Sequence, residues 1–237
     1  MKAPNRVYRT TSDLQPQDIR GLYDRFNSPI AELDCGKKCA PHNPSGKPFC
    51  CDICHAIPAA YKSEWNYLEE NTKLWHTWRG DECATTSAKE RVELKADTPK
   101  NMVLLACLGP TQCERDFRAL SCRQFPFLPY VTADYRFIGI AYEWEFENKC
   151  WVISNLSQVT PQYRTEFIST FDHLFALFQS EFDNYANHSE NLRDAYSHRK
   201  KRFPLLHRNG QCYLVSPQSE RMKRVDVADL PRFYPYS

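Results

Sequence analysis

The sequence predicts an α+β fold with an antiparallel sheet, about three helices and long cysteine-rich loops. Two observations lead to this prediction. Some segments carry apolar residues at helical spacing, whereas others alternate strictly between apolar and polar residues, as strands with one buried face do. Between these segments lie proline-rich stretches that hold most of the eleven cysteines of the 237-residue chain.

Three helices are expected along the chain. A short one covers about residues 17–26, a second runs from about Ser63 to Trp78, and a third from Pro161 to about Tyr185. The third is the clearest, because Thr160 can cap it and Pro161 occupies the first helical position, where a missing N–H costs nothing. Its apolar stripe, which we interpret as core, consists of Phe167, Phe171, Leu174, Phe175, Phe178, Phe182 and Tyr185.

Strands are expected between the helices. The first signal covers Met102 to Leu105. Residues 138–146 alternate strictly, with apolar side chains on one face and glutamates on the other, and Asn148-Lys149 then predicts a turn into a second strand at 150–153. Asn209-Gly210 predicts a two-residue hairpin near the end of the sequence.

The order of these elements predicts three consecutive parts of what is most simply one continuous domain. Residues 1–34 form an N-terminal arm with a short helix, and residues 35–130 form a cysteine-rich region. Residues 131–237 form an α+β portion packed on that region. The chain is long enough to bury a sizeable core without disulfides or metal.

The overall charge and the N-terminal residues narrow the class of protein. A formal charge of +2 does not indicate a nucleic-acid-binding surface. The N-terminal residues contain no apolar segment suited to a signal peptide, and no run is long enough to span a bilayer. We therefore expect a cytoplasmic, reducing compartment, where cysteines bind metal or do redox chemistry more often than they form disulfides.

Eight cysteines fall into two groups, one within residues 35–54 and the other within residues 107–122. Prolines and glycines between Cys39 and Cys50 exclude a regular helix there, so we expect metal to organise that loop. Thiolates bind zinc tetrahedrally and also hold iron–sulfur clusters. The predicted metal ligands are Cys35, Cys39, Cys50, Cys51, Cys54, Cys107, Cys113 and Cys122.

The remaining candidates are weaker. Cys83, Cys150 and Cys212 are interpreted as buried thiols without a metal role, since free cysteine behaves as a small hydrophobe. His42 and His55 lie inside the first group and are minor candidates for a ligand position.

Two arginines are predicted to contact the metal or cofactor. Arg118 and Arg123 flank Cys122, where a guanidinium could offset thiolate charge or hold an anionic ligand. An ordinary surface position is the alternative for each of them.

The segment from Arg118 to Phe125 also resembles a known family. An early cysteine group that ends in the pair Cys50-Cys51, followed later by an arginine, three residues and Cys-Arg-x-Phe, is similar to the CxxCxxCC (YkgJ-type) family. That family is described as a putative zinc- or iron-chelating domain, and the flagellin lysine N-methylases carry a related domain. The resemblance covers roughly residues 35–127, with a longer gap before Cys50 than the family has.

The resemblance implies an iron–sulfur cluster, with a four-iron cluster favoured, and methyl transfer that depends on S-adenosylmethionine. No two of the seven glycines form a G-x-G, so a Rossmann-type nucleotide loop is not expected. The alternative is a non-enzymatic zinc module that binds a protein or small-molecule partner. No catalytic residue can be assigned, although His76, Asp81 and Glu82 are candidates beside the cysteines.

Overall fold

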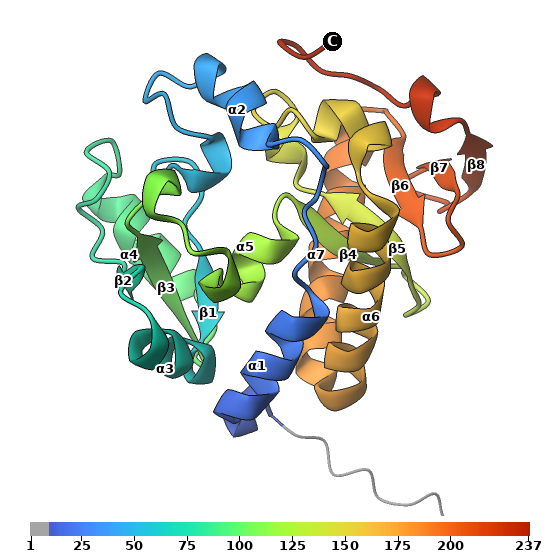
Figure 1. Ribbon diagram of the computed structural model, residues 1–237. Coiled ribbons are helices and arrows are strands. Elements are labelled where there is room, and N and C mark those ends of the chain that lie inside the picture. The colour runs from blue at the N-terminus through green and yellow to red at the C-terminus, as the bar shows by residue number, and fades with distance from the viewer. Residues whose placement is uncertain (1–9) are drawn as a thin grey trace, which may run out of the picture.

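Two antiparallel sheets organise the chain, and the computed structural model describes residues 10–237 of it (Figure 1). A three-stranded sheet with the order β1-β3-β2 lies in the N-terminal half, and a five-stranded sheet with the order β4-β5-β6-β7-β8 in the C-terminal half. The predicted α+β class with an antiparallel sheet is therefore confirmed. Seven α-helices lie within residues 10–237, more than the three that were expected.

The small sheet is built around β3 (Met102–Cys107), which pairs with β1 (Ala59–Tyr61) and with β2 (Trp75–Thr77). The helix expected over 63–78 is α3 (Lys62–Asn71), and its last part is the strand β2 instead. At Thr72 the backbone is extended, and the helix ends there. Residues 75–77 then pair with β3 as a strand instead of continuing the helix. Trp75 thereby comes to lie opposite Cys107.

The large sheet consists of β4 (Phe127–Val131), β5 (Phe137–Tyr142), β6 (Phe203–His207), β7 (Cys212–Val215) and β8 (Met222–Val225). The hairpin around Asn209-Gly210 is present, but its loop has three residues, because the His207 amide donates to the Gln211 carbonyl. Gly210, at φ +87°, supplies the left-handed position that such a loop needs.

The strands predicted after residue 142 are wrong. Once β5 ends at Tyr142, residues Trp144–Phe146 form a 3-10 turn. The Cys150 amide donates to the Phe146 carbonyl, so Cys150 lies in a turn rather than in a strand. A second 3-10 segment, Ile153–Gln158, follows it. The apolar side chains here pack against the core without sheet pairing.

The long helix predicted from Pro161 is divided at Phe178. It consists of α6 (Pro161–Leu177) and α7 (Gln179–His198), and Phe178 between them has an extended backbone and a fully buried ring. Phe178 therefore reaches the core from a position outside either helix. Along α7, Ser189 accepts a hydrogen bond from the Val131 amide of β4.

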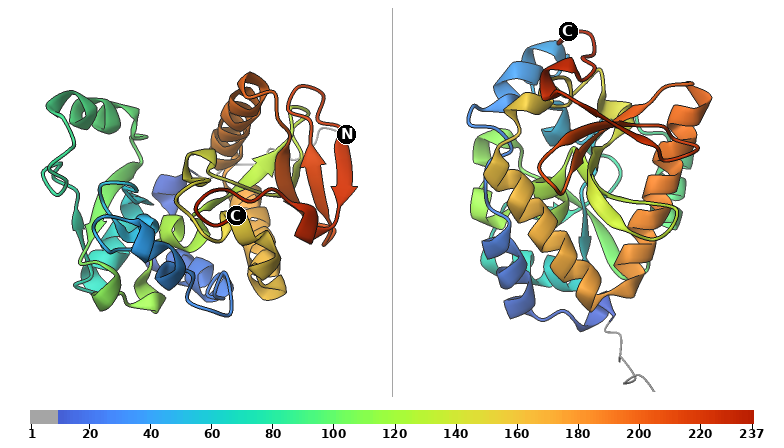
Figure 2. Two further views of the ribbon diagram at one scale, coloured as in Figure 1. Left: turned by 90° about the horizontal axis from the view of Figure 1, so that it is seen from above. Right: turned by 90° about the vertical axis from the view of Figure 1, so that its right-hand side faces the viewer.

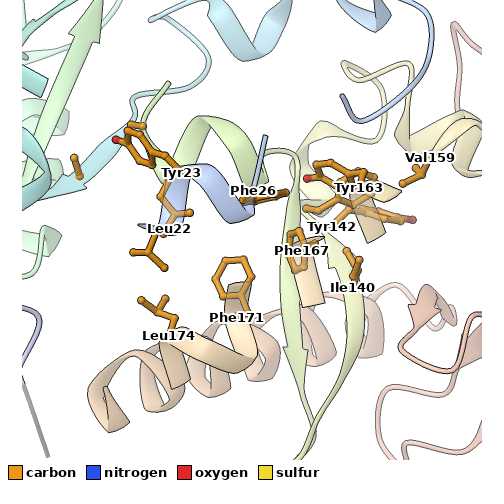
Figure 3. Close-up of a cluster of buried hydrophobic side chains, with 14 of the residues drawn as sticks. Leu22, Tyr23, Phe26, Ile140, Tyr142, Val159, Tyr163, Phe167, Phe171 and Leu174 are labelled. Atoms are coloured by element: carbon orange, nitrogen blue, oxygen red, sulfur yellow. The ribbon is translucent and has the colours of Figure 1, made fainter. Parts of the chain in front are cut away.

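The helix expected over 17–26 is α1 (Pro16–Arg25), which packs between α3 and α6. Figure 3 shows Leu22 of α1, and Phe26 just beyond the helix, on the side that faces Phe167 and Phe171 of α6, whereas Tyr23 points away from these two rings. The Tyr23 ring packs instead against the Tyr67 ring of α3. Three helices were not predicted from the sequence, namely α2 (Cys35–Cys39), α4 (Ala88–Asp97) and α5 (Leu120–Gln124). The exposed α4 stands out at one edge of the molecule (Figure 2).

One hydrophobic cluster joins the three predicted parts of the chain. It includes Leu22 from the arm, Leu105 from the cysteine-rich region and Phe171 from the C-terminal portion. The expected boundary between residues 130 and 131 falls inside strand β4. Within residues 10–237, no helix has both the length and the apolar character needed to cross a membrane.

Candidate metal centre

The cysteines that form the candidate centre come from six separate places in the fold. Helix α2 supplies Cys35 and Cys39, and a 3-10 turn, Phe49–Cys51, supplies the adjacent pair Cys50 and Cys51. In Figure 1, α2 lies beside the yellow loop that contains residue 150. The contributions from the rest of the chain are Cys107 at the end of β3, Cys113 in the loop after it, Cys122 on α5 and Cys150 in its turn.

Polar side chains help to hold the proline-rich loop that carries the first cysteines. Asp34 caps α2 by accepting from the Gly36 amide at 3.0 Å. Further along, the buried Asp52 carboxylate accepts from Asn43 Nδ2 at 3.0 Å and from Ser45 Oγ at 2.6 Å. These hydrogen bonds bring the loop back on itself. The expectation that metal also organises this loop stays a prediction.

Cys51 occupies the middle of the group of thiols. Its sulfur lies 3.8 Å from the sulfur of Cys50, whose hydrogen bond lowers the pKa of Cys51 to about 7. Burial opposes this shift and the Arg118 charge supports it. Burial raises the pKa values of four other cysteines, and the nearby Cys51 charge raises them further; these are Cys35, Cys39, Cys107 and Cys122. The pKa of Cys51 thus lies nearer to neutral pH than those of these four cysteines.

Backbone amides near several of the sulfurs favour their charged form. The amides of Phe49 and Trp151 act to lower the pKa of Cys39, and the amide of Gly109 that of Cys107, against the larger effect of burial. Gly109 has φ +98°, a backbone conformation that side-chain-bearing residues rarely adopt. The amides two and three residues after Cys150 act on its pKa in the same direction. Such N–H···S bonds stabilise thiolates and commonly surround metal-bound cysteine.

Cys54, a predicted ligand, is joined to Cys83 by a disulfide with a Cα–Cα distance of 5.2 Å. The sequence placed Cys54 with the metal ligands and Cys83 with the buried thiols, and both interpretations need correction. A disulfide sulfur is not a thiolate, so Cys54 is withdrawn from the ligand set in this structure. The two residues are separated by 29 positions, and no short motif connects them.

Cys150 was interpreted as a thiol without a metal role, but it lies with the predicted ligands. Burial is the main cause that raises the pKa of Cys150, and the nearby charges of Cys35 and Cys39 raise it further. The turn signal at Asn148-Lys149 could have indicated that Cys150 leaves the sheet. Cys212, by contrast, is buried on β7, where its charged neighbours are Arg164 and Asp226.

Arg123 was predicted to contact a cofactor, but its guanidinium is committed to the protein itself. Its Nε donates to the Arg118 carbonyl at 2.8 Å, and its plane lies 4.2 Å from the centre of the Tyr23 ring. The two terminal nitrogens donate to the carbonyls of Tyr23, Phe26, Arg115 and Asp116 and to the side chain of Asn27. Arg123 is therefore a structural residue that ties α5 to the end of α1.

Arg118 contacts the thiols directly. Its Nε donates to the Cys113 sulfur at 3.0 Å, and its charge acts on Cys51 and Cys122 as well. Arg118 also lines a cavity of about 390 Å³ together with Arg115, Cys35 and Cys122. The remaining wall of this cavity consists of Arg123 and the irregular segment from Phe26 to Asp34. A small molecule in the cavity would lie against the thiols.

The minor candidates have other contacts. The His42 ring meets the Tyr236 ring at 5.1 Å and the His55 ring meets the Phe49 ring at 5.0 Å, so each packs against an aromatic side chain. Glu82 accepts from the amides of Arg79 and Gly80 and lies 3.8 Å from His76. Glu82 therefore holds its own turn, beside the disulfide rather than beside the free thiols.

Across residues 10–237, no three side chains of His, Cys, Asp or Glu are arranged for the direct binding of a single metal ion. The group is thus a gathering of thiols with backbone and arginine donors around it. Comparison with known proteins adds no further information, since no protein family, curated protein or solved structure matches this chain.

Proposed function

We propose that this chain is a metal-binding protein whose gathered thiols hold an iron–sulfur cluster. The observation that carries the proposal is the convergence of eight free cysteines from six segments of the fold. Buried thiols that share no role are not expected to cluster when more than a hundred residues of sequence separate them. Thiolates that bind iron or zinc must meet in this way.

The donors around the sulfurs support the same proposal. Four thiolates on a dicationic cluster or on Zn²⁺ leave a net charge near −2, which nearby hydrogen-bond donors and cations must offset. Arg118 and the amides directed at Cys39, Cys107 and Cys150 can supply this compensation. The cysteines that would hold the metal are Cys35, Cys39, Cys50, Cys51, Cys107, Cys113, Cys122 and Cys150.

The cavity beside Arg118 favours a reactive centre over a purely structural one. A structural zinc site is closed, whereas a reactive metal centre needs a place for a small molecule next to it. The cavity meets this need, because Cys35, Cys122 and Arg118 form part of its wall. When bound, an iron–sulfur cluster supplies electron transfer or a Lewis-acidic iron. Methyl transfer from S-adenosylmethionine is the specific activity that the family resemblance adds.

The proposed location is the cytoplasm. Nine of the eleven cysteines are free in the structure, and free thiols in such number persist in a reducing compartment. In that compartment the disulfide between the exposed Cys54 and the buried Cys83 is open to reduction, whereas the gathered thiols would be protected by metal.

The test is metal analysis of protein purified without oxygen, together with its visible absorption spectrum. We expect stoichiometric iron and sulfide with a broad brown absorption that disappears on oxidation. Colourless protein with tightly bound zinc would favour the zinc module instead. Protein that binds neither metal after reconstitution would refute the proposal. The Cys212→Ser variant is the matched control, because Cys212 lies apart from the group and should leave metal content unchanged.

A further inference from the structure

We infer that the cavity beside the thiols binds a small monocarboxylate through Arg118. The cavity has a volume of about 390 Å³, and Arg118, Cys35 and Cys122 form part of its wall. The inference rests on the proposed function for what the ligand does there, since a molecule held by Arg118 would lie against the thiols. The binding itself needs no metal, so the site can be tested apart from the metal centre.

Three arginines line this cavity, and the protein itself engages two of them. Arg123 donates to the carbonyls of its buried network. Arg115 donates from Nε at 3.0 Å and from one terminal nitrogen at 2.6 Å to the carbonyl oxygen of Asn27. These two guanidiniums therefore hold the wall of the cavity in shape. Arg118 is the arginine that keeps donors for a ligand.

The guanidinium of Arg118 is fixed at one point and open at the other. Its Nε atom donates to the Cys113 sulfur at 3.0 Å. Its two terminal nitrogens donate no hydrogen bond within residues 10–237, and neither is among the fully buried atoms without a partner there. Both therefore remain accessible on a half-buried side chain of the cavity wall. The end of a guanidinium presents two parallel N–H groups, which match the two oxygens of a carboxylate.

The segment that forms the rest of the wall adds backbone donors. The amides of Asn27 and Ser28 donate to Glu166, whereas those of residues 30–33 form no hydrogen bond in the described part of the chain. Ala31, one of these four residues, has an exposed fraction of only 4%. Buried amides are nearly always paired, so an open one on a cavity wall indicates a ligand or ordered water. Successive open amides are suited to an anion.

The charges on the wall favour one negative charge over two. Besides the three guanidiniums, the lining side chains include the carboxylates of Glu32 and Asp34, which leaves one positive charge in excess. Asp34 is engaged by the Gly36 amide, whereas Glu32 is exposed and has no ion pair among the described residues. A phosphate dianion would bring two charges near Glu32, but a monocarboxylate brings only one.

The test compares ligands that differ in charge but not in shape. Isothermal titration calorimetry measures the binding of lactate and gluconate to the purified protein, each against its uncharged amide, with inorganic phosphate as a second anion. We expect both carboxylates to bind about 10- to 100-fold more tightly than their amides, because the amides lose the charged hydrogen bonds. Phosphate should bind more weakly than either carboxylate.

Three variants assign the binding to this cavity. Arg118→Lys keeps the positive charge but loses the fork, and should weaken lactate binding about 10-fold or more. Arg115→Gln should weaken it no more than about fivefold, because the donors of Arg115 are on the Asn27 carbonyl and its charge is exposed. Glu32→Gln should strengthen lactate binding, because it removes a like charge from the wall.

Four results would overturn the inference. These are no binding of either carboxylate, equal affinity for lactate and lactamide, tighter binding of phosphate than of both carboxylates, and unchanged lactate affinity in Arg118→Lys. Weaker lactate binding in Glu32→Gln would also contradict an anion site. Circular dichroism confirms that each variant is folded, and where Arg118→Lys is not, the comparison of acid with amide and the Glu32→Gln variant decide.

Metal analysis of the same samples keeps this inference separate from the proposed function. Metal-loaded protein that binds neither lactate nor gluconate would refute the carboxylate site alone. Protein that binds lactate but takes up neither iron nor zinc on reconstitution would refute the proposed function alone.

Discussion

Arg118 donates from its Nε atom to the sulfur of Cys113 across 3.0 Å. The bond links a guanidinium on the wall of a cavity to a thiol of the candidate centre. The guanidinium of Arg118 has further N–H donors on its terminal nitrogens besides the one on Nε. One residue can thus stabilise a thiolate and meet an anion at the same time.

Replacing Arg118 with glutamine should weaken metal binding about 10- to 100-fold, which is the usual effect of losing a partner outside the ligand shell. The reason is that the Cys113 thiolate loses its charged donor. Competition with a chelator of known affinity measures the change. Arg115→Gln is the matched control, because Arg115 lines the same cavity but donates to the Asn27 carbonyl instead of to sulfur. Equal metal affinity in both variants would contradict the role given to Arg118.

Arg123→Met should destabilise the fold rather than the metal centre. The variant leaves buried carbonyls of α1 and of the segment before α5 without donors, and each such loss costs roughly 1–3 kcal/mol. We expect a decrease of about 3 kcal/mol or more in the free energy of unfolding, measured by urea denaturation. Arg208→Met is the control, because the ion pair of Arg208 with Asp172 is on the surface and contributes about 1 kcal/mol at most. A similar decrease in the free energy of unfolding of both variants would contradict the stabilising role given to the buried hydrogen bonds of Arg123.

The parts of the fold that follow from local pattern were predictable. The apolar stripe that includes Phe167, Phe171 and Leu174 identified α6, because periodic burial leaves a periodic sequence. The interruption at Phe178 was not predictable, since phenylalanine continues the same stripe and only tertiary packing makes the backbone extended there. The same reason applies to Trp75, where pairing with β3 replaced a local helical preference.

The candidate site likewise has a part that could be predicted from the sequence and a part that could not. Cysteines close together in sequence, such as Cys50 and Cys51, could be recognised from their spacing alone. Cys150 could not, because its neighbours Cys35 and Cys39 lie more than a hundred residues earlier and meet it only through the folding of the loop after β5. The pairing of Cys54 with Cys83 is likewise a product of tertiary structure.

Cys54→Ser should lower stability without lowering metal content. Closing the 29-residue interval between Cys54 and Cys83 restricts the unfolded chain, and loop-closure entropy gives about 3–4 kcal/mol for this interval. Thermal unfolding should therefore shift downward in Cys54→Ser, and reductant should shift the wild type by a similar amount while leaving the variant unchanged. Cys83→Ser should behave in the same way. Metal lost from Cys54→Ser but retained in Cys83→Ser would restore Cys54 to the ligand set.

Glu166 of α6 should make the stability of the fold depend on acidic pH. Its carboxylate accepts from the Ser28 amide at 2.7 Å, the Ser28 hydroxyl at 2.5 Å and the Asn27 amide at 3.0 Å, and so fixes the segment that walls the cavity. Burial acts to raise the pKa of Glu166, but these hydrogen bonds outweigh it and lower the pKa below its ordinary value.

A carboxylate whose pKa is lower in the folded state contributes its stabilisation above its unfolded pKa, about 4.3, and loses it as the pH falls through the folded value. Glu166→Gln should therefore be less stable than wild type at pH 7, and the difference in urea midpoint should shrink as the pH approaches 3. Gln162→Ala is the control, because Gln162 Nε2 also donates to Glu166 but its loss leaves in place the hydrogen bonds of Glu166 with Asn27 and Ser28. A midpoint difference between Glu166→Gln and wild type that stays constant from pH 7 to pH 3 would show that the carboxylate charge does not stabilise this junction.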